Sequence, residues 1–126
     1  MKPEYPIFIL TKDEMSIAML VNSKELNFYE QIDIEEGLYE GWDVRGYPII
    51  LSWDKKYGTK IEITKEITQL EKLEEAIINY AKLYNPKVPF KYSGPENNIT
   101  ELFNEVEKHI KKDTFREKLK HLFKRS

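Results

Sequence analysis

The chain has 126 residues, of which 40% are hydrophobic and 33% charged, and its formal net charge is −2. This length suits one domain that folds without a metal or disulfide. The absence of cysteine excludes disulfides and thiolate chemistry, and it favours a reducing compartment. We expect no signal peptide and no membrane span, because every apolar run is far shorter than the roughly 18 residues that a span needs. A soluble, cytoplasmic protein is therefore predicted.

The first 63 residues alternate short apolar runs with polar turns, which is typical of β-strands. The run from Tyr5 to Leu10 is almost continuously apolar and predicts a strand buried on both faces. The polar turn 22–25 is expected to join two further strands as an antiparallel hairpin. The predicted strands, most simply arranged as an antiparallel meander, are 5–10, 15–21, 26–34, 38–43, 47–53 and 60–63.

After residue 63 the apolar residues recur at three- and four-residue spacing, which predicts helices. Thr68 and Glu71 fit a capping box at the start of the first helix. Asn98 and Glu101 mark the start of the second helix, and the third either stands alone or continues the second as one bent helix. The predicted helices span residues 68–84, 98–112 and 114–124.

Strands followed by helices, without alternation, argue against a doubly wound parallel sheet. The sequence therefore predicts a single α+β domain over residues 1–126. An antiparallel sheet of five or six strands (residues 5–63) is followed by two or three helices packed on one face.

Charge is unevenly divided along the chain. Residues 1–63 carry seven Lys or Arg against twelve Asp or Glu, and no basic residue lies between Lys24 and Arg45. Aromatic residues interleave with the carboxylates of that stretch, and aromatic residues dominate many protein interfaces. The pattern predicts an acidic aromatic surface that binds a protein partner, formed by Tyr29, Glu30, Asp33, Glu35, Glu36, Tyr39, Glu40, Trp42, Asp43 and Tyr47.

Other interpretations of these residues stay open. Paired carboxylates also serve as acid and base in hydrolysis, or bind Ca²⁺ or Mg²⁺, although the EF-hand spacing is absent. Trp42 and Asp43 either belong to the contact surface or have a structural role. In the structural interpretation Trp42 packs inside, and Asp43 bonds the backbone of a tight turn in which Gly46 takes a positive φ.

The C-terminal end is basic, with eight Lys or Arg against two acidic residues over residues 108–126. A basic amphipathic helix meets phosphates, membrane surfaces or acidic partners, or it is a solvated face that the helix dipole favours. The overall pI near 5.8 argues against a dedicated nucleic-acid binder. The candidate anion-binding residues are Lys111, Lys112, Arg116, Lys118, Lys120, Lys124 and Arg125.

Signatures of cofactor and metal chemistry are missing. His109 and His121 stand twelve residues apart without a metal-binding motif, and no phosphate-binding glycine loop or GxSxG is present. We expect no cofactor, no metal and no enzymatic activity. The favoured function is a protein-binding module, in particular a bacterial immunity or antitoxin-like inhibitor of a basic toxin or nuclease. The alternatives are an adaptor that binds nucleic acid or an anionic surface, and a carboxylate-based hydrolase.

Overall fold

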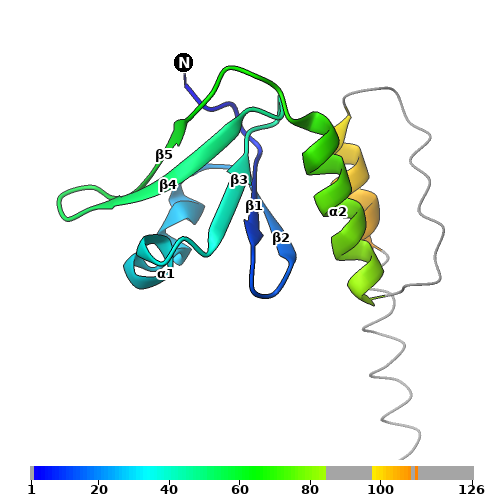
Figure 1. Cartoon of the computed structure of the whole chain (residues 1–126), viewed down its shortest axis with the longest axis horizontal. Coiled ribbons are helices and arrows are strands. Elements are labelled where there is room, and N and C mark those ends of the chain that lie inside the picture. The colour runs from blue at the N-terminus through cyan, green and yellow to red at the C-terminus, as the bar shows by residue number, and fades with distance from the viewer. Residues whose placement is uncertain (1, 85–97, 109, 111–126) are drawn as a thin grey trace, which may run out of the picture.

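The computed structural model describes residues 2–84, 98–108 and 110, and within them it confirms the α+β fold (Figure 1). Five antiparallel strands form one sheet in the order β2-β1-β3-β4-β5. The long helix α2 and a second helical segment, residues 99–108, lie together on one side of that sheet. The elements are β1 (Ile7–Thr11), β2 (Ser16–Leu20), the 3-10 helix η1 (Ser23–Phe28), α1 (Gln31–Glu35), β3 (Tyr39–Trp42), β4 (Pro48–Asp54), β5 (Gly58–Ile63) and α2 (Leu70–Tyr84).

β1 is a central strand of the sheet and is buried on both faces, as its apolar run predicts. It pairs with β2 on one edge and with β3 on the other. Ile7 and Ile9 point to one face, and Phe8 and Leu10 point to the other. Such a strand buries nearly all of its apolar surface, which is worth about 1.5–3 kcal/mol for each large side chain.

The sheet separates two hydrophobic cores. On the helix side, strand residues such as Phe8 and Trp42 pack against a stripe on α2 that includes Leu73 and Ile77. The helical segment 99–108 and Ile110 complete this core with Ile99, Leu102, Phe103, Val106 and Ile110. The opposite core contains Ile7, Ile9, Leu20, Leu26, Ile49 and Leu51, and η1 and α1 lie against it.

The predicted strand 26–34 is wrong, because η1 and α1 occupy that part of the chain. The side chain of Asn22 accepts a hydrogen bond from the backbone N–H of Lys24 (3.0 Å) and starts the 3-10 turn. Leu26 and Ile34 both reach the same core from this helical path. The hairpin expected around residues 22–25 is therefore absent, and the sheet is not a sequential meander.

The helix starts were predicted with mixed success. Asn98 accepts from the backbone N–H of Glu101 (3.1 Å) and donates to its carboxylate (2.8 Å), which confirms that cap. The Thr68 hydroxyl instead donates to the Arg45 carbonyl (2.8 Å), outside the helix. Among the described residues no helix is long and apolar enough to cross a membrane. The predicted helix 114–124, and whether it continues the preceding one, lie outside the described residues.

The carboxylate of Asp43 organises the turn between β3 and β4, and it is completely buried. Its Oδ1 accepts from the backbone N–H groups of Arg45 (2.9 Å) and Tyr47 (3.1 Å). Its Oδ2 accepts from the Arg45 guanidinium (2.7 Å to Nη2 and 3.0 Å to Nε) and from the backbone of Glu4 (3.2 Å). Asp43 thus joins the N-terminal segment to the turn, and this hydrogen bonding raises the pKa of Arg45.

Gly46 links that turn to α2. It has a φ of +83°, and an added Cβ would lie 2.9 Å from both the backbone nitrogen of Leu70 and the hydroxyl oxygen of Thr68. Its carbonyl accepts from the backbone N–H of Gln69 at 2.7 Å. Only glycine allows both this backbone conformation and so close an approach, and the predicted positive φ is confirmed.

Replacement of Asp43 by alanine tests how much the turn contributes. Asp43→Ala leaves backbone donors and a half-exposed guanidinium without their acceptor, and we expect a loss of about 3 kcal/mol in the free energy of unfolding. Asp54 makes a comparable bond to the backbone of Lys56 (2.9 Å) in the β4–β5 turn, but it is 42% exposed. Asp54→Ala is therefore the matched control and should cost about 1 kcal/mol or less, because water replaces the lost partner. Urea unfolding would contradict this account if the two losses were equal.

Candidate functional site

The stretch around η1 and α1 carries most of the exposed residues of the predicted acidic surface. Its inner side is anchored by Leu26 and Ile34 in the opposite core. The rings of Tyr29 and Tyr39 meet edge to face with centroids 4.8 Å apart. The hydroxyl of Thr59 on β5 donates to the Tyr29 carbonyl (3.2 Å). These contacts hold the segment in a defined position on the sheet.

The outer side of the same segment is both apolar and acidic. Phe28 is 83% exposed and Ile32 is 65% exposed. The carboxylates of Glu30, Glu35 and Glu36 are exposed around them. We call this the η1–α1 surface and define it by Phe28, Glu30, Ile32, Asp33, Glu35 and Glu36.

The carboxylates of the η1–α1 surface keep their charge uncompensated within the described part of the chain. Asp33 accepts from the Tyr39 hydroxyl (3.3 Å), and Glu35 accepts from the Gln31 side chain (2.9 Å). The ion pairs between described residues involve Glu4, Glu40, Asp43 and Asp54 instead. No group of three ligands suitable for a metal ion occurs among the described residues. The segment therefore presents negative charge to the solvent.

Two tyrosines under this surface have perturbed ionisation. Burial, then the neighbouring Tyr39 and Glu25, raises the pKa of Tyr29 to about 12. Burial and the Asp33 carboxylate also raise the pKa of Tyr39. Both phenols are neutral at physiological pH, so the negative charge of the surface comes from its carboxylates.

Four other residues of the predicted surface lie elsewhere. Trp42 is buried and donates from its indole nitrogen to the side-chain oxygen of Gln69 (3.0 Å), and Asp43 is buried in the turn described above. Trp42 therefore packs inside and Asp43 bonds the turn backbone, as in the structural interpretation given above. Glu40 forms an ion pair with Lys72 of α2 (2.6 Å). Tyr47 lies under the Arg45 guanidinium, whose carbon is 4.8 Å from the ring centroid.

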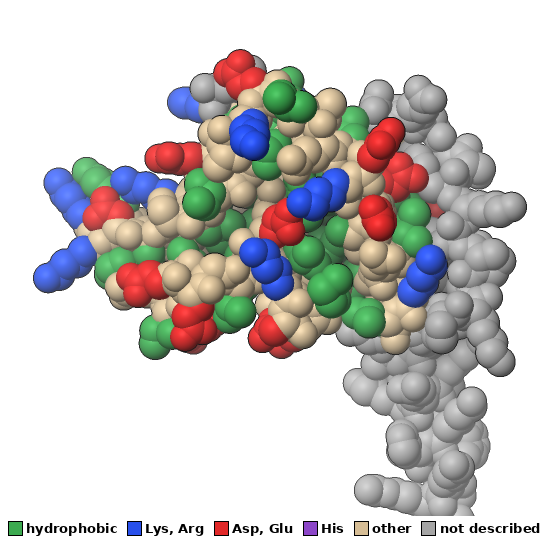
Figure 2. Space-filling model, in the orientation of Figure 1, with side chains coloured by type: hydrophobic (Ala, Val, Ile, Leu, Met, Phe, Trp, Pro, Cys, Tyr) green, Lys and Arg blue, Asp and Glu red, His purple; other side chains and the backbone are tan. Residues whose placement is uncertain are grey.

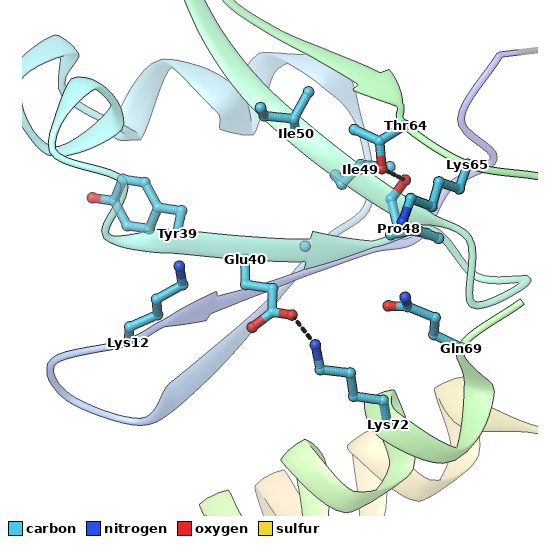
Figure 3. A pocket seen from close by; sticks show the side chains of 11 residues that line it. Lys12, Tyr39, Glu40, Pro48, Ile49, Ile50, Thr64, Lys65, Gln69 and Lys72 are labelled. Atoms are coloured by element: carbon cyan, nitrogen blue, oxygen red, sulfur yellow. Dashed lines mark hydrogen bonds and ion pairs between the residues drawn. The ribbon is translucent and has the colours of Figure 1, made fainter. Parts of the chain in front are cut away.

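An open hollow of about 340 Å³ lies between the sheet and the start of α2 (Figure 3). The Glu40–Lys72 ion pair spans it. Among the described residues that line the hollow, Glu40 alone carries a carboxylate. The others include Lys12, Lys65, Gln69 and Ile50. The described structure does not bring Glu40 together with Asp33, Glu36 or Asp43 in this hollow.

Charges of both signs are interspersed on the face that contains the hollow, as Figure 2 shows. Lys55 and Lys56 lie in the turn between β4 and β5, and the ammonium groups of Lys56 and Lys60 both lie over the Tyr57 ring, 5.3 and 4.6 Å from its centroid. This mixed face differs from the η1–α1 surface, where the exposed charges are acidic.

Sequence reasoning missed Phe28 and Ile32, because it placed both of them in the predicted strand 26–34. The local signal that could have found them is Asn22, a residue type that favours a helical turn directly after it. The predicted anion-binding residues, Lys111 to Arg125, lie outside the described residues and stay a prediction.

Comparison with known proteins gives no family. No family model matches the chain, and no curated protein or solved structure matches it either.

Alkaline titration tests the environment of Tyr29. The unfolded chain deprotonates this phenol near pH 10, whereas the folded chain holds the proton to about pH 12. Stability from this group is therefore complete below pH 10 and is lost as the pH rises toward 12. Tyr29→Phe should flatten the fall in unfolding free energy over this range and remove the latest step from the absorbance titration of tyrosinate. An unchanged titration curve would show that Tyr29 is not the perturbed group.

Proposed function

We propose that the chain is a non-enzymatic binding module whose η1–α1 surface docks on a basic protein surface. The observation that carries this proposal is the combination of two large exposed apolar side chains, Phe28 and Ile32, with uncompensated carboxylates on the same short segment.

The apolar part would supply affinity. Phe28 and Ile32 lie four residues apart, on helical turns fixed to the sheet through Leu26 and Tyr29. A segment whose backbone is already fixed loses less conformational freedom when a partner covers it. Exposed anchors of this kind dominate the energy of many interfaces.

The carboxylates would supply partner selection. Glu30, Glu35 and Glu36 are exposed, and no basic residue lies between Lys24 and Arg45. A basic partner gains attraction from this surface, while an acidic one is repelled. A basic toxin or nuclease held inactive by such a module is the biological role that we favour within this class.

Charge reversal and removal of the anchor test the proposal. The chain is used to capture proteins from its source cell, and each captured protein is purified and titrated with variants. Phe28→Ser should weaken binding about tenfold or more, because an anchor side chain is lost. Glu30→Lys/Glu36→Lys should slow association and reverse its dependence on salt concentration.

Glu66→Lys/Glu75→Lys is the matched control, since it makes the same change in net charge at exposed positions near and on α2. This control should bind like the unaltered chain. A captured partner that responds equally to both double variants, or that ignores Phe28→Ser, would contradict the proposed surface.

A further inference from the structure

β5 is an edge strand of the sheet, on the opposite edge from β2. In Figure 1 it lies on the far side of β4 from β3 and away from α2. One side of β5 pairs with β4 along its whole length. The other side presents backbone groups that could pair with a further strand.

The hydrogen-bond pattern identifies which residues present those groups. The backbone N–H of Thr64 donates to the Pro48 carbonyl (3.0 Å), which makes these two residues a hydrogen-bonded pair in continuation of the β4–β5 register. Such pairs alternate along an antiparallel ladder. Glu62 and Lys60 therefore direct their backbone groups toward β4, and the residues between and beside them direct theirs outward. The residues whose backbone N–H and C=O groups point away from β4 are Thr59, Ile61 and Ile63.

These outer groups have no backbone hydrogen-bond partner among the described residues. η1 packs against β5, but the contact that Thr59 makes to Tyr29 uses its side-chain hydroxyl and not its backbone groups. The side chains of Ile61 and Ile63 pack against the opposite core but stay partly exposed, so a further strand at this edge would bury more of them.

The charges of β5 select a partner for this edge. Charged residues on an edge strand usually discourage pairing. In β5, however, Lys60 and Glu62 flank Ile61 symmetrically and point to the same face, where Lys60 also pairs with Asp54 of its own chain (3.3 Å). If a second β5 pairs antiparallel with its centre at Ile61, each Lys60 lies opposite Glu62 of the other copy.

Two other antiparallel registers also bring the unpaired backbone groups of the two β5 strands opposite each other, but their side-chain charges repel. A centre at residue 60 places two Lys60 side chains opposite each other, and a centre at residue 62 does the same with two Glu62 side chains. Like charges directly opposite in a sheet are destabilising. The centre at Ile61 also aligns Thr59 with Ile63 of the other copy, so the free backbone groups of Thr59, Ile61 and Ile63 all face a partner.

We propose that two copies of the chain associate through their β5 edges, antiparallel and centred on Ile61, so that one sheet continues through both. Ile61 pairs with its equivalent through two backbone hydrogen bonds. The Lys60–Glu62 pairs occupy the non-hydrogen-bonded positions, where opposite Cα atoms are closest, at about 4.5 Å. The interface is isologous, as a two-fold dimer requires.

Sedimentation equilibrium over concentrations up to about 1 mM tests the proposal, because it detects dimers across the weak affinities expected for an edge contact. The unaltered chain should dimerise. Lys60→Glu and Glu62→Lys should each weaken dimerisation about tenfold or more, since both cross-strand pairs become repulsive. An equimolar mixture of the two variants should regain the affinity as a heterodimer, in which both pairs are again opposite in charge.

Two kinds of control separate pairing from general effects. Lys55→Glu and Glu66→Lys change the net charge equally at exposed positions outside β5 and should dimerise like the unaltered chain. Ile61→Pro removes an outward donor without breaking the ladder to β4 and should abolish the dimer, with the fold checked by circular dichroism.

Three results would overturn the proposal. These are a chain that is monomeric throughout the concentration range, a dimer that survives both single charge reversals, and a mixture that fails to recover affinity. Monomers that instead take up a strand from another protein at this edge would also count against it.

Discussion

The buried carboxylate of Asp43 is the interaction on which the arrangement of the other elements depends. An ionised carboxylate that is buried away from water is stable only when a positive charge and hydrogen-bond donors surround it. Asp43 meets this condition with the Arg45 guanidinium and with backbone donors from the turn and from Glu4, which lies 39 residues earlier. The turn between β3 and β4 therefore has one shape, and Gly46 sits where α2 begins. Its carbonyl then receives the N–H of Gln69, which fixes the direction in which the helix leaves the sheet.

That starting point explains why the two faces of the sheet differ. α2 contacts β2, and the core beneath it draws on β1, β2 and β3. On the same side, Ile50 of β4 is 54% exposed, and Lys60 and Glu62 of β5 are also exposed. On the opposite face, η1 packs against β2 and β5 and α1 packs against β4. The molecule thus combines a strand buried on both faces with an edge strand that is half open.

The sequence carried enough information for most strands, because alternation and apolar runs reflect burial directly. The stretch 26–34 was ambiguous, since the even spacing of Leu26 and Ile34 fits one face of a strand, whereas Asn22 favours a helical turn after it. The fate of Trp42 and Asp43 could not be decided locally. Their partners, Gln69 and Glu4, are distant in sequence, so only tertiary structure shows whether the pair faces solvent or the interior.

The proposed binding surface and the proposed edge contact lie on different elements but are geometrically related. Pairing centred on Ile61 keeps the same face of the sheet in both copies, because opposite residues of antiparallel strands point to one side. η1 and α1 cover the face that contains Ile61. The two η1–α1 surfaces of a dimer would therefore lie on the same side of the extended sheet. A partner with two basic patches, or a partner that is itself two-fold symmetric, could then engage both, and its second contact would form at a high effective concentration. Weak pairing at β5 and moderate affinity at each surface would in this way strengthen each other without any additional contact.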